Sequence, residues 1–100
     1  MAKKTAPSSR SLALEGDLDV FSVHQQWEQA QPLMAADSGT VEVDLSGIGD
    51  MDLSGLQLLS VLDRDLRSRG AELKLTGVKD EWKTRFLPLG MAGLFGGEHP

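Results

Sequence analysis

The sequence predicts a single α/β domain in which helices flank a small, mostly parallel sheet of about four strands. Segments with strand periodicity alternate with segments of helical periodicity along the chain. Strands separated by helices need crossover connections, which place the strands parallel in one sheet. With 100 residues, 40% of them apolar, the chain suffices for one modest core, which argues against a second domain.

The first third of the chain is expected to hold a strand and a helix. Leucines at alternate positions predict a short strand at 12–14, which the glycine-containing residues 16–19 close. Residues 22–25 have the spacing of a capping box, so a helix should begin near Ser22. This helix should end or kink near Pro32, because proline lacks a backbone N–H.

Two further strands and two helices should follow. Alternating apolar and acidic residues predict a strand at 40–45, which a loop follows. Residues 54–69 have one apolar helical face, and Gly70 is placed to end this helix. Leucines alternate with polar residues in a strand at 73–76, and Asp80 is expected to cap a last helix.

The boundaries of the domain follow from composition. Residues 1–10 are basic and polar and are expected to form a disordered tail, with the domain at 11–96 and a short C-terminal tail at 97–100. Three strands are evident, so a sheet of four needs one more. Residues 16–21 are the place where a short edge strand would fit.

Charge and composition restrict the partners and the compartment. Fifteen acidic residues against ten basic ones give a net charge of -5, which argues against nucleic acid or an anionic membrane surface as the main partner. The chain has no cysteine, no apolar run long enough to span a bilayer, and no apolar segment typical of a signal peptide. We therefore expect a cytoplasmic protein that binds other proteins or small ligands without inserting into a membrane.

Ser54 lies where a loop gives way to the second predicted helix, and it is the first candidate for chemistry. The free N–H groups and the dipole at a helix N-terminus stabilise an anion, so a phosphate on Ser54 would be favoured there. The alternative is that Ser54 only caps the helix, because serine is among the commonest capping residues. The local pattern alone leaves both interpretations open.

The sequence offers no constellation for catalysis and no cofactor site. His24 falls on the first helix and His99 near the end of the chain, and neither has an evident nucleophile beside it. The carboxylates of Asp44, Asp50 and Asp52 do not follow the spacing of a calcium loop. We therefore expect neither an enzyme nor a metal-binding protein.

The two tryptophans are interpreted as core anchors. Trp27 and Trp82 both fall on the apolar stripes of predicted helices, where large aromatic residues bury most area. Leu94, Phe95 and the apolar segment around Met51 suit either a core or an interface between chains. The oligomeric state stays open for that reason.

Four segments of the chain resemble, in order, the STAS domain of bacterial anti-sigma factor antagonists and related regulatory modules. The resemblance covers about residues 12–95 and implies a small sheet flanked by helices. The matching segments are Gly16-Asp17-Leu18-Asp19, Val43-Asp44-Leu45-Ser46-Gly47, Met51-Asp52-Leu53-Ser54-Gly55-Leu56 and Leu73-Lys74-Leu75-Thr76-Gly77-Val78.

The resemblance implies a regulatory protein–protein interaction module. In the antagonist branch, a serine in an Asp-Ser-Ser-Gly-Leu motif is phosphorylated by a partner of ATPase fold that is both serine kinase and anti-sigma factor. Ser54 occupies the phosphoacceptor position, Asp52 matches the acidic residue before it, and Asp19 matches the acidic residue that ends the first strand. The partner is then expected to bind around Ser54, at Asp19, Gly49, Met51, Asp52, Leu53 and Gly55.

One position departs from the antagonist motif. Leu53 stands where the antagonists usually carry a second serine or a threonine. This departure favours an alternative within the family, a STAS accessory subunit of a lipid-transport ATP-binding cassette complex, or a scaffold linked to chemotaxis, without phosphorylation. The retained hydroxyl of Ser54 favours the phosphorylation-controlled switch.

Overall fold

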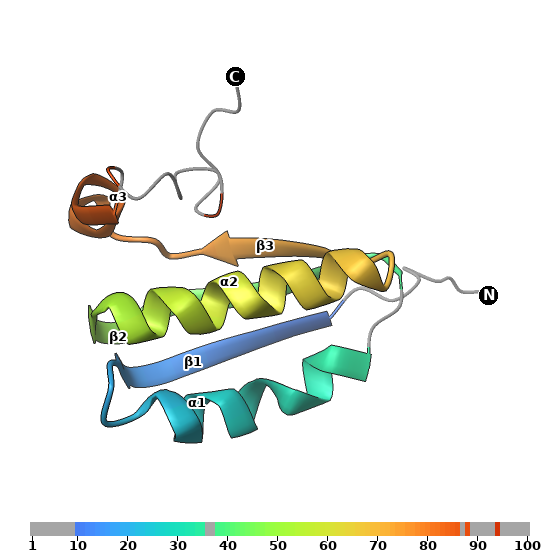
Figure 1. The fold of residues 1–100 in the computed structure, drawn as a ribbon, viewed down its shortest axis with the longest axis horizontal. Coiled ribbons are helices and arrows are strands. Elements are labelled where there is room, and N and C mark those ends of the chain that lie inside the picture. Colours follow the sequence, from blue (N-terminus) through green and yellow to red (C-terminus); the bar gives the residue numbers. More distant parts are fainter. Residues whose placement is uncertain (1–9, 36–37, 87, 89–93, 95–100) are drawn as a thin grey trace.

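The computed structural model describes residues 10–35, 38–86, 88 and 94 (Figure 1). Strands and helices alternate as the periodicity predicts, with a short 3₁₀ helix, η1, after the first helix. The elements in chain order are β1 (Arg10–Leu18), α1 (Val23–Ala30), η1 (Gln31–Ala35), β2 (Thr40–Met51), α2 (Leu53–Ser68), β3 (Glu72–Thr76) and α3 (Asp80–Phe86).

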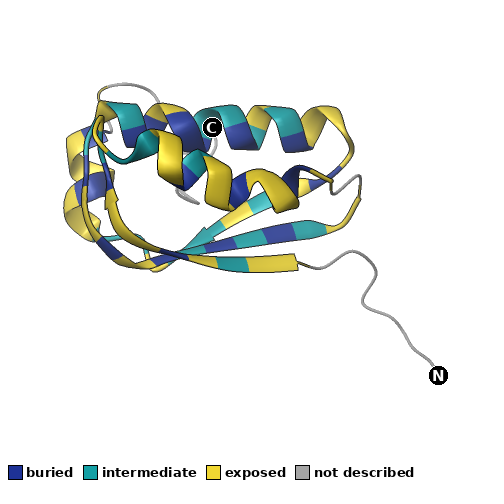
Figure 2. Ribbon diagram, turned by 90° about the horizontal axis from the view of Figure 1, so that it is seen from below, coloured by how far each residue is buried: buried dark blue, intermediate teal, exposed yellow. Residues whose placement is uncertain are grey.

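The described strands form one parallel sheet in the order β1-β2-β3. β2 is central, and its Val41 pairs with Arg10 of β1 on one side and Leu73 of β3 on the other. α1 and α2 both cover one face of this sheet (Figure 2), and α3 lies beyond the edge strand β3 (Figure 1). Because the strands are parallel, the β1–α1 turn and the start of α2 lie together at their carboxyl ends.

The described residues contain three strands rather than about four, because residues 16–18 prolong β1 instead of forming a separate edge strand. β2 likewise continues to Met51, where the sequence predicts a loop. The two strands stay paired as far as Leu18 and Met51 across two register shifts. A Cβ on Gly47 would lie 3.0 Å from the carbonyl oxygen of Leu14. Gly47, in the segment where the sequence predicts a loop, therefore lets the two backbones approach closely.

The ends of the domain differ in part from the expectation. Arg10 pairs with Val41, so β1 begins inside the segment that was expected to be a tail. Residues 1–9, Phe95 and the expected C-terminal tail at 97–100, which includes His99, lie outside the described residues.

The helix boundaries follow the local signals. α1 begins directly after Ser22, and Pro32 lies in η1, which carries Leu33 and Met34 into the core. α2 ends before Gly70, whose φ of 89° is one that residues with a side chain rarely adopt. None of the described helices combines the length and apolar composition needed to cross a membrane.

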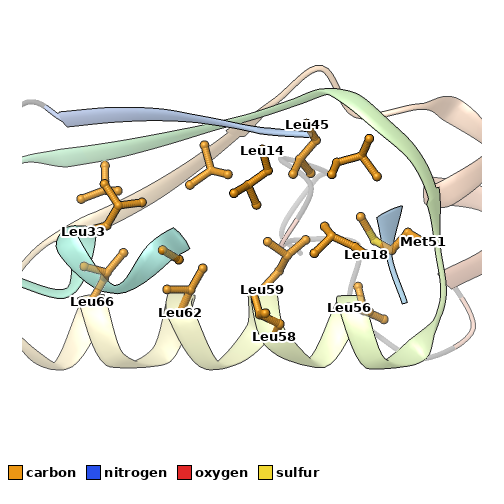
Figure 3. Close-up of a cluster of buried hydrophobic side chains, with 14 of the residues drawn as sticks. Leu14, Leu18, Leu33, Leu45, Met51, Leu56, Leu58, Leu59, Leu62 and Leu66 are labelled. Atoms are coloured by element: carbon orange, nitrogen blue, oxygen red, sulfur yellow. The ribbon is translucent and has the colours of Figure 1, made fainter. Parts of the chain in front are cut away.

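A hydrophobic core fills the space between α2 and the sheet (Figure 3). Leu14 and Leu45 project from the strands toward Leu59 of α2, and all three are almost fully buried. Trp82 of α3 is also fully buried, as predicted, whereas Trp27 of α1 is only partly buried against the core. The buried apolar residues of α2 are Leu56, Leu58, Leu59, Leu62 and Leu66.

Candidate functional site

The first turn of α2 is capped by Asp52 and not by Ser54. Asp52 has extended backbone angles, and its Oδ1 accepts hydrogen bonds from the backbone N–H of Ser54 at 2.8 Å and of Gly55 at 3.3 Å. These bonds satisfy N–H groups that a helix N-terminus leaves free. Ser54 is the second residue of the helix, so the interpretation of Ser54 as the capping residue is wrong.

The hydroxyl of Ser54 lies at a groove on the surface of the domain. Ser54 is half-buried, and its hydroxyl has no hydrogen-bond partner among the described residues. It lies at a shallow groove of about 440 Å³ between α1 and α2, whose other lining residues are Val23, His24, Trp27, Gln57, Leu58 and Val61. The groove is mostly apolar, so the hydroxyl borders a surface that suits an apolar partner side chain.

Three apolar side chains are exposed in the β1–α1 turn and at the first residue of α2. Within the described part of the chain, the large hydrophobic residues that are exposed are Val20 (59%), Phe21 (94%) and Leu53 (50%). The N–H of Val20 donates to Asp52 Oδ2 at 3.1 Å, which brings the β1–α1 turn against the start of α2. We call Val20, Phe21 and Leu53 the apolar rim. Exposed apolar residues gathered in this way are typical of a protein interaction surface.

Val20 and Phe21 are not among the site residues predicted from the sequence. The sequence does contain an indication of this surface. Val20 and Phe21 are adjacent apolar residues in a turn between Asp19 and Ser22, where at most one of them can point into the core. The sequence motif points to the segment around Ser54 instead. The tertiary structure adds the turn because β1 ends beside the residue where α2 begins, as the bond from Asp52 N to Leu18 O at 3.0 Å shows.

Asp19 shapes this turn. Its Oδ1 accepts hydrogen bonds from the N–H of Phe21 and of Ser22, both at 3.0 Å, and from the Ser22 hydroxyl at 2.8 Å. The Ser22 hydroxyl also donates to the carbonyl of Asp17 at 2.6 Å. Ser22 therefore makes no side-chain bond to the first turn of α1, and the predicted capping box does not form.

The glycines and the methionine of the predicted site lie at different depths. Gly49 is exposed, and its carbonyl accepts a hydrogen bond from Lys79 Nζ at 2.8 Å. Met51 is fully buried in the core, and Gly55 is buried where α2 meets the backbone of Leu18. In this structure neither the side chain of Met51 nor Gly55 is exposed, and both lie beneath the surface around Ser54.

One cation of α3, Arg85, holds the segment that leads into α2. Arg85 Nη1 donates to the carbonyl of Met51 at 2.6 Å and lies 3.5 Å from Asp50 Oδ1. Arg85 Nη2 lies 3.2 Å from Glu81. The positive charge of Arg85 therefore partly offsets the negative charge of the segment around Asp50 and Asp52.

Two other titratable residues considered from the sequence are His24 and Asp44. His24 is exposed, and its Nε2 lies 3.5 Å from Glu28 Oε2. Hydrogen bonds from the backbone N–H of Ser46, at 2.9 Å, and from its hydroxyl hold the pKa of Asp44 below its ordinary value of 3.8. Within the described residues, no group of three or more histidine or carboxylate side chains is placed to hold a metal ion.

Comparison with known proteins agrees with this fold. Residues 1–96 match a family model described as "Mlab, STAS domain". No curated protein matches the sequence significantly. Three solved structures are similar at low identity, which supports the fold alone.

The first is a sulfate transporter family protein from Wolinella succinogenes, with 16% identity, a TM-score of 0.70 and coverage of 94% of this chain and 77% of the other. The second is the anti-sigma factor antagonist SpoIIAA in its unphosphorylated form, with 18% identity, a TM-score of 0.69 and coverage of 96% and 85%. The third is the STAS domain of a SulP transporter from Vibrio cholerae, with 19% identity, a TM-score of 0.68 and coverage of 93% and 72%. The family match over nearly the whole chain and the shared fold identify this protein as a member of the STAS domain family.

Proposed function

We propose that this STAS domain is a cytoplasmic regulatory module that binds a protein partner through the surface around Ser54, and that phosphorylation of Ser54 weakens the binding. The observation that carries the proposal is the half-buried hydroxyl of Ser54, which has no hydrogen-bond partner among the described residues and lines the apolar groove next to the exposed Leu53. The partner class is an anti-sigma factor with serine kinase activity and an ATPase fold, by the resemblance to the antagonists.

In the proposed switch, phosphorylation adds negative charge to Ser54 within an otherwise apolar contact with the partner. The partner's kinase activity would transfer the γ-phosphoryl group of ATP to Ser54 Oγ, which loses its proton, and ADP leaves. The product carries about -1.5 to -2 charges at neutral pH. A partner packed against Leu53 and Val20 would then have to desolvate this charge, which costs binding free energy unless a cation on the partner compensates for it.

A second candidate function is a constitutive contact in a larger complex. Leu53, half-exposed beside Ser54, supplies apolar contact area that needs no chemical control. This feature supports an accessory subunit of a lipid-transport ATP-binding cassette complex or a chemotaxis-linked scaffold, in which Ser54 stays unmodified.

Affinity capture from the source organism's lysate separates the two functions. The wild type, Ser54→Ala and Ser54→Asp would be used as baits, with Ser68→Asp as a matched control that adds the same charge at the exposed far end of α2. Mass spectrometry identifies the proteins that each bait retains.

The switch predicts that the wild type, Ser54→Ala and Ser68→Asp retain an ATPase-fold kinase and that Ser54→Asp loses it. Incubation of that kinase with ATP should then add one phosphate to the wild type and none to Ser54→Ala. Equal recovery of a transporter ATPase or a chemoreceptor complex by all four baits would contradict the switch and support the constitutive function.

A further inference from the structure

One carboxylate connects the start of α2 to the β1–α1 turn. Asp52 Oδ1 accepts the N–H groups of Ser54 and Gly55, while Oδ2 of the same side chain accepts the N–H of Val20 at 3.1 Å. The position of the Val20 backbone therefore depends on where this carboxylate lies. No other side chain among the described residues accepts this N–H.

The β1–α1 turn has hydrogen bonds of its own that do not involve the Asp52 carboxylate. The carboxylate of Asp19 holds the N–H groups of Phe21 and Ser22, so the turn keeps its own shape when its bond to Asp52 is lost. Val20 and Phe21 are the most exposed members of the apolar rim, so a displacement of the turn changes the surface offered to a partner.

A negative charge on Ser54 competes directly with Asp52. An anion at a helix N-terminus is stabilised by free backbone N–H groups, and Asp52 already accepts those of Ser54 and Gly55. The two anions also repel each other across a distance of a few bonds. If the carboxylate leaves these donors, its bond to Val20 is lost with them.

We propose that Asp52 is a positioning residue that couples the charge on Ser54 to the placement of the Val20–Phe21 turn. The inference rests on the proposed function only in taking Ser54 as the residue that gains charge. In this proposal phosphorylation has two effects. It places negative charge beside Leu53, and it releases the turn that carries Val20 and Phe21.

The test follows the backbone amide of Val20 by NMR in the full chain, through its chemical shift and its rate of hydrogen exchange. The variants are Ser54→Asp, Asp52→Ala and the double variant of both, with Gln57→Glu as a matched control. Gln57 lines the same groove one turn further along α2, so this control adds charge near Ser54 without a hydrogen bond to Asp52. Asp52→Asn repeats the measurement with a neutral acceptor in case Asp52→Ala folds poorly.

The coupling predicts that Ser54→Asp makes exchange at Val20 about fivefold faster, as loss of one hydrogen bond of typical net strength would. Asp52→Ala should give the same change, the double variant no further change, and Gln57→Glu none. An unchanged Val20 amide in Ser54→Asp, or an equal effect of Ser54→Asp with and without Asp52, would overturn the coupling. If Ser54→Asp loses the partner while the Val20 amide is unchanged, the coupling fails and the proposed function stands.

Discussion

At the scale of single residues, Asp52 and Ser54 have different roles at the start of α2. Asp52 satisfies two helical N–H groups and the N–H of Val20, so its role in the folded domain is structural. Ser54 contributes no side-chain bond among the described residues, so the fold does not depend on its hydroxyl. A residue that the fold does not need can be modified without unfolding the domain.

This division predicts different costs for two alanine substitutions. Asp52→Ala should lower the free energy of unfolding by about 0.5–2 kcal/mol, the usual cost of losing a capping side chain. Ser54→Ala should change it by less than about 0.5 kcal/mol, as surface substitutions commonly do. Urea unfolding at pH 7 measures both values. A larger loss for Ser54→Ala than for Asp52→Ala would contradict the assignment of the cap.

Asp44 predicts a pH dependence of stability. Hydrogen bonds from Ser46 lower the pKa of Asp44 in the folded state, so its charged form stabilises the fold above the unfolded pKa, and this contribution disappears as pH falls through the folded value. The difference in unfolding midpoint between the wild type and Asp44→Asn should be constant near neutral pH and shrink below about pH 4. An NMR titration that places the pKa of Asp44 above 3.8 would contradict this prediction.

At the scale of elements, the close approach of α2 to β1 sets the geometry of the site. A Cβ on Gly55 would lie 2.6 Å from Cβ of Leu18 and closer still to the Leu18 carbonyl oxygen. The glycine therefore allows α2 to begin directly against the end of β1, which brings the β1–α1 turn beside Ser54. The same contact explains why Gly55 is buried and acts from below the surface.

Gly55→Ala should for this reason destabilise the domain, although alanine is the better helix former. Overpacking of this kind typically costs about 1–3 kcal/mol, which exceeds the gain of about 1 kcal/mol from replacing glycine within a helix. Gln57→Ala, an exposed substitution on the same helix, is the matched control. Urea unfolding should show a lower midpoint for Gly55→Ala alone. An unchanged or raised midpoint would mean that α2 and β1 leave room for a methyl group at this position, which would contradict the close contact.

At the scale of the whole molecule, the residues that hold the fold and the residues that form the surface are separate. The core lies between α2 and the sheet and includes residues with no exposed area, such as Leu59 and Leu62. The apolar rim lies at the carboxyl ends of the strands, where the structure leaves Phe21 almost fully exposed. Substitutions in these two regions should therefore affect different properties.

Phe21→Ser should leave the free energy of unfolding within about 0.5 kcal/mol of the wild type, since the side chain buries almost nothing in the fold. It should weaken partner binding by about fivefold or more, because truncating an aromatic anchor that carries binding energy at an interface costs more than about 1 kcal/mol. Leu59→Ala is the opposite case and should cost about 2–5 kcal/mol of stability. Calorimetric titration with the captured partner and urea unfolding measure these effects, and unaltered affinity in Phe21→Ser would exclude the turn from the interface.

The sequence by itself determined the alternation of strands and helices, the parallel sheet, the burial of Trp82 and the family. Local periodicity and motif spacing carry that information, since each depends on neighbours in the chain. The sequence also singled out the segment around Ser54. It did not reveal that Met51 is buried or that glycines near residue 47 continue a strand, because both depend on pairing between β1 and β2.

Only the tertiary structure decided which residues share the surface with Ser54. Val20 and Phe21 are more than thirty positions away in sequence, and they come beside α2 because parallel strands end at the same edge of the sheet. Asp52 was selected for its motif position, but its role as cap and as link to Val20 depends on two segments meeting in space. Contacts between segments far apart in the chain leave no periodic signal in either segment, which is the physical reason that the sequence did not give them.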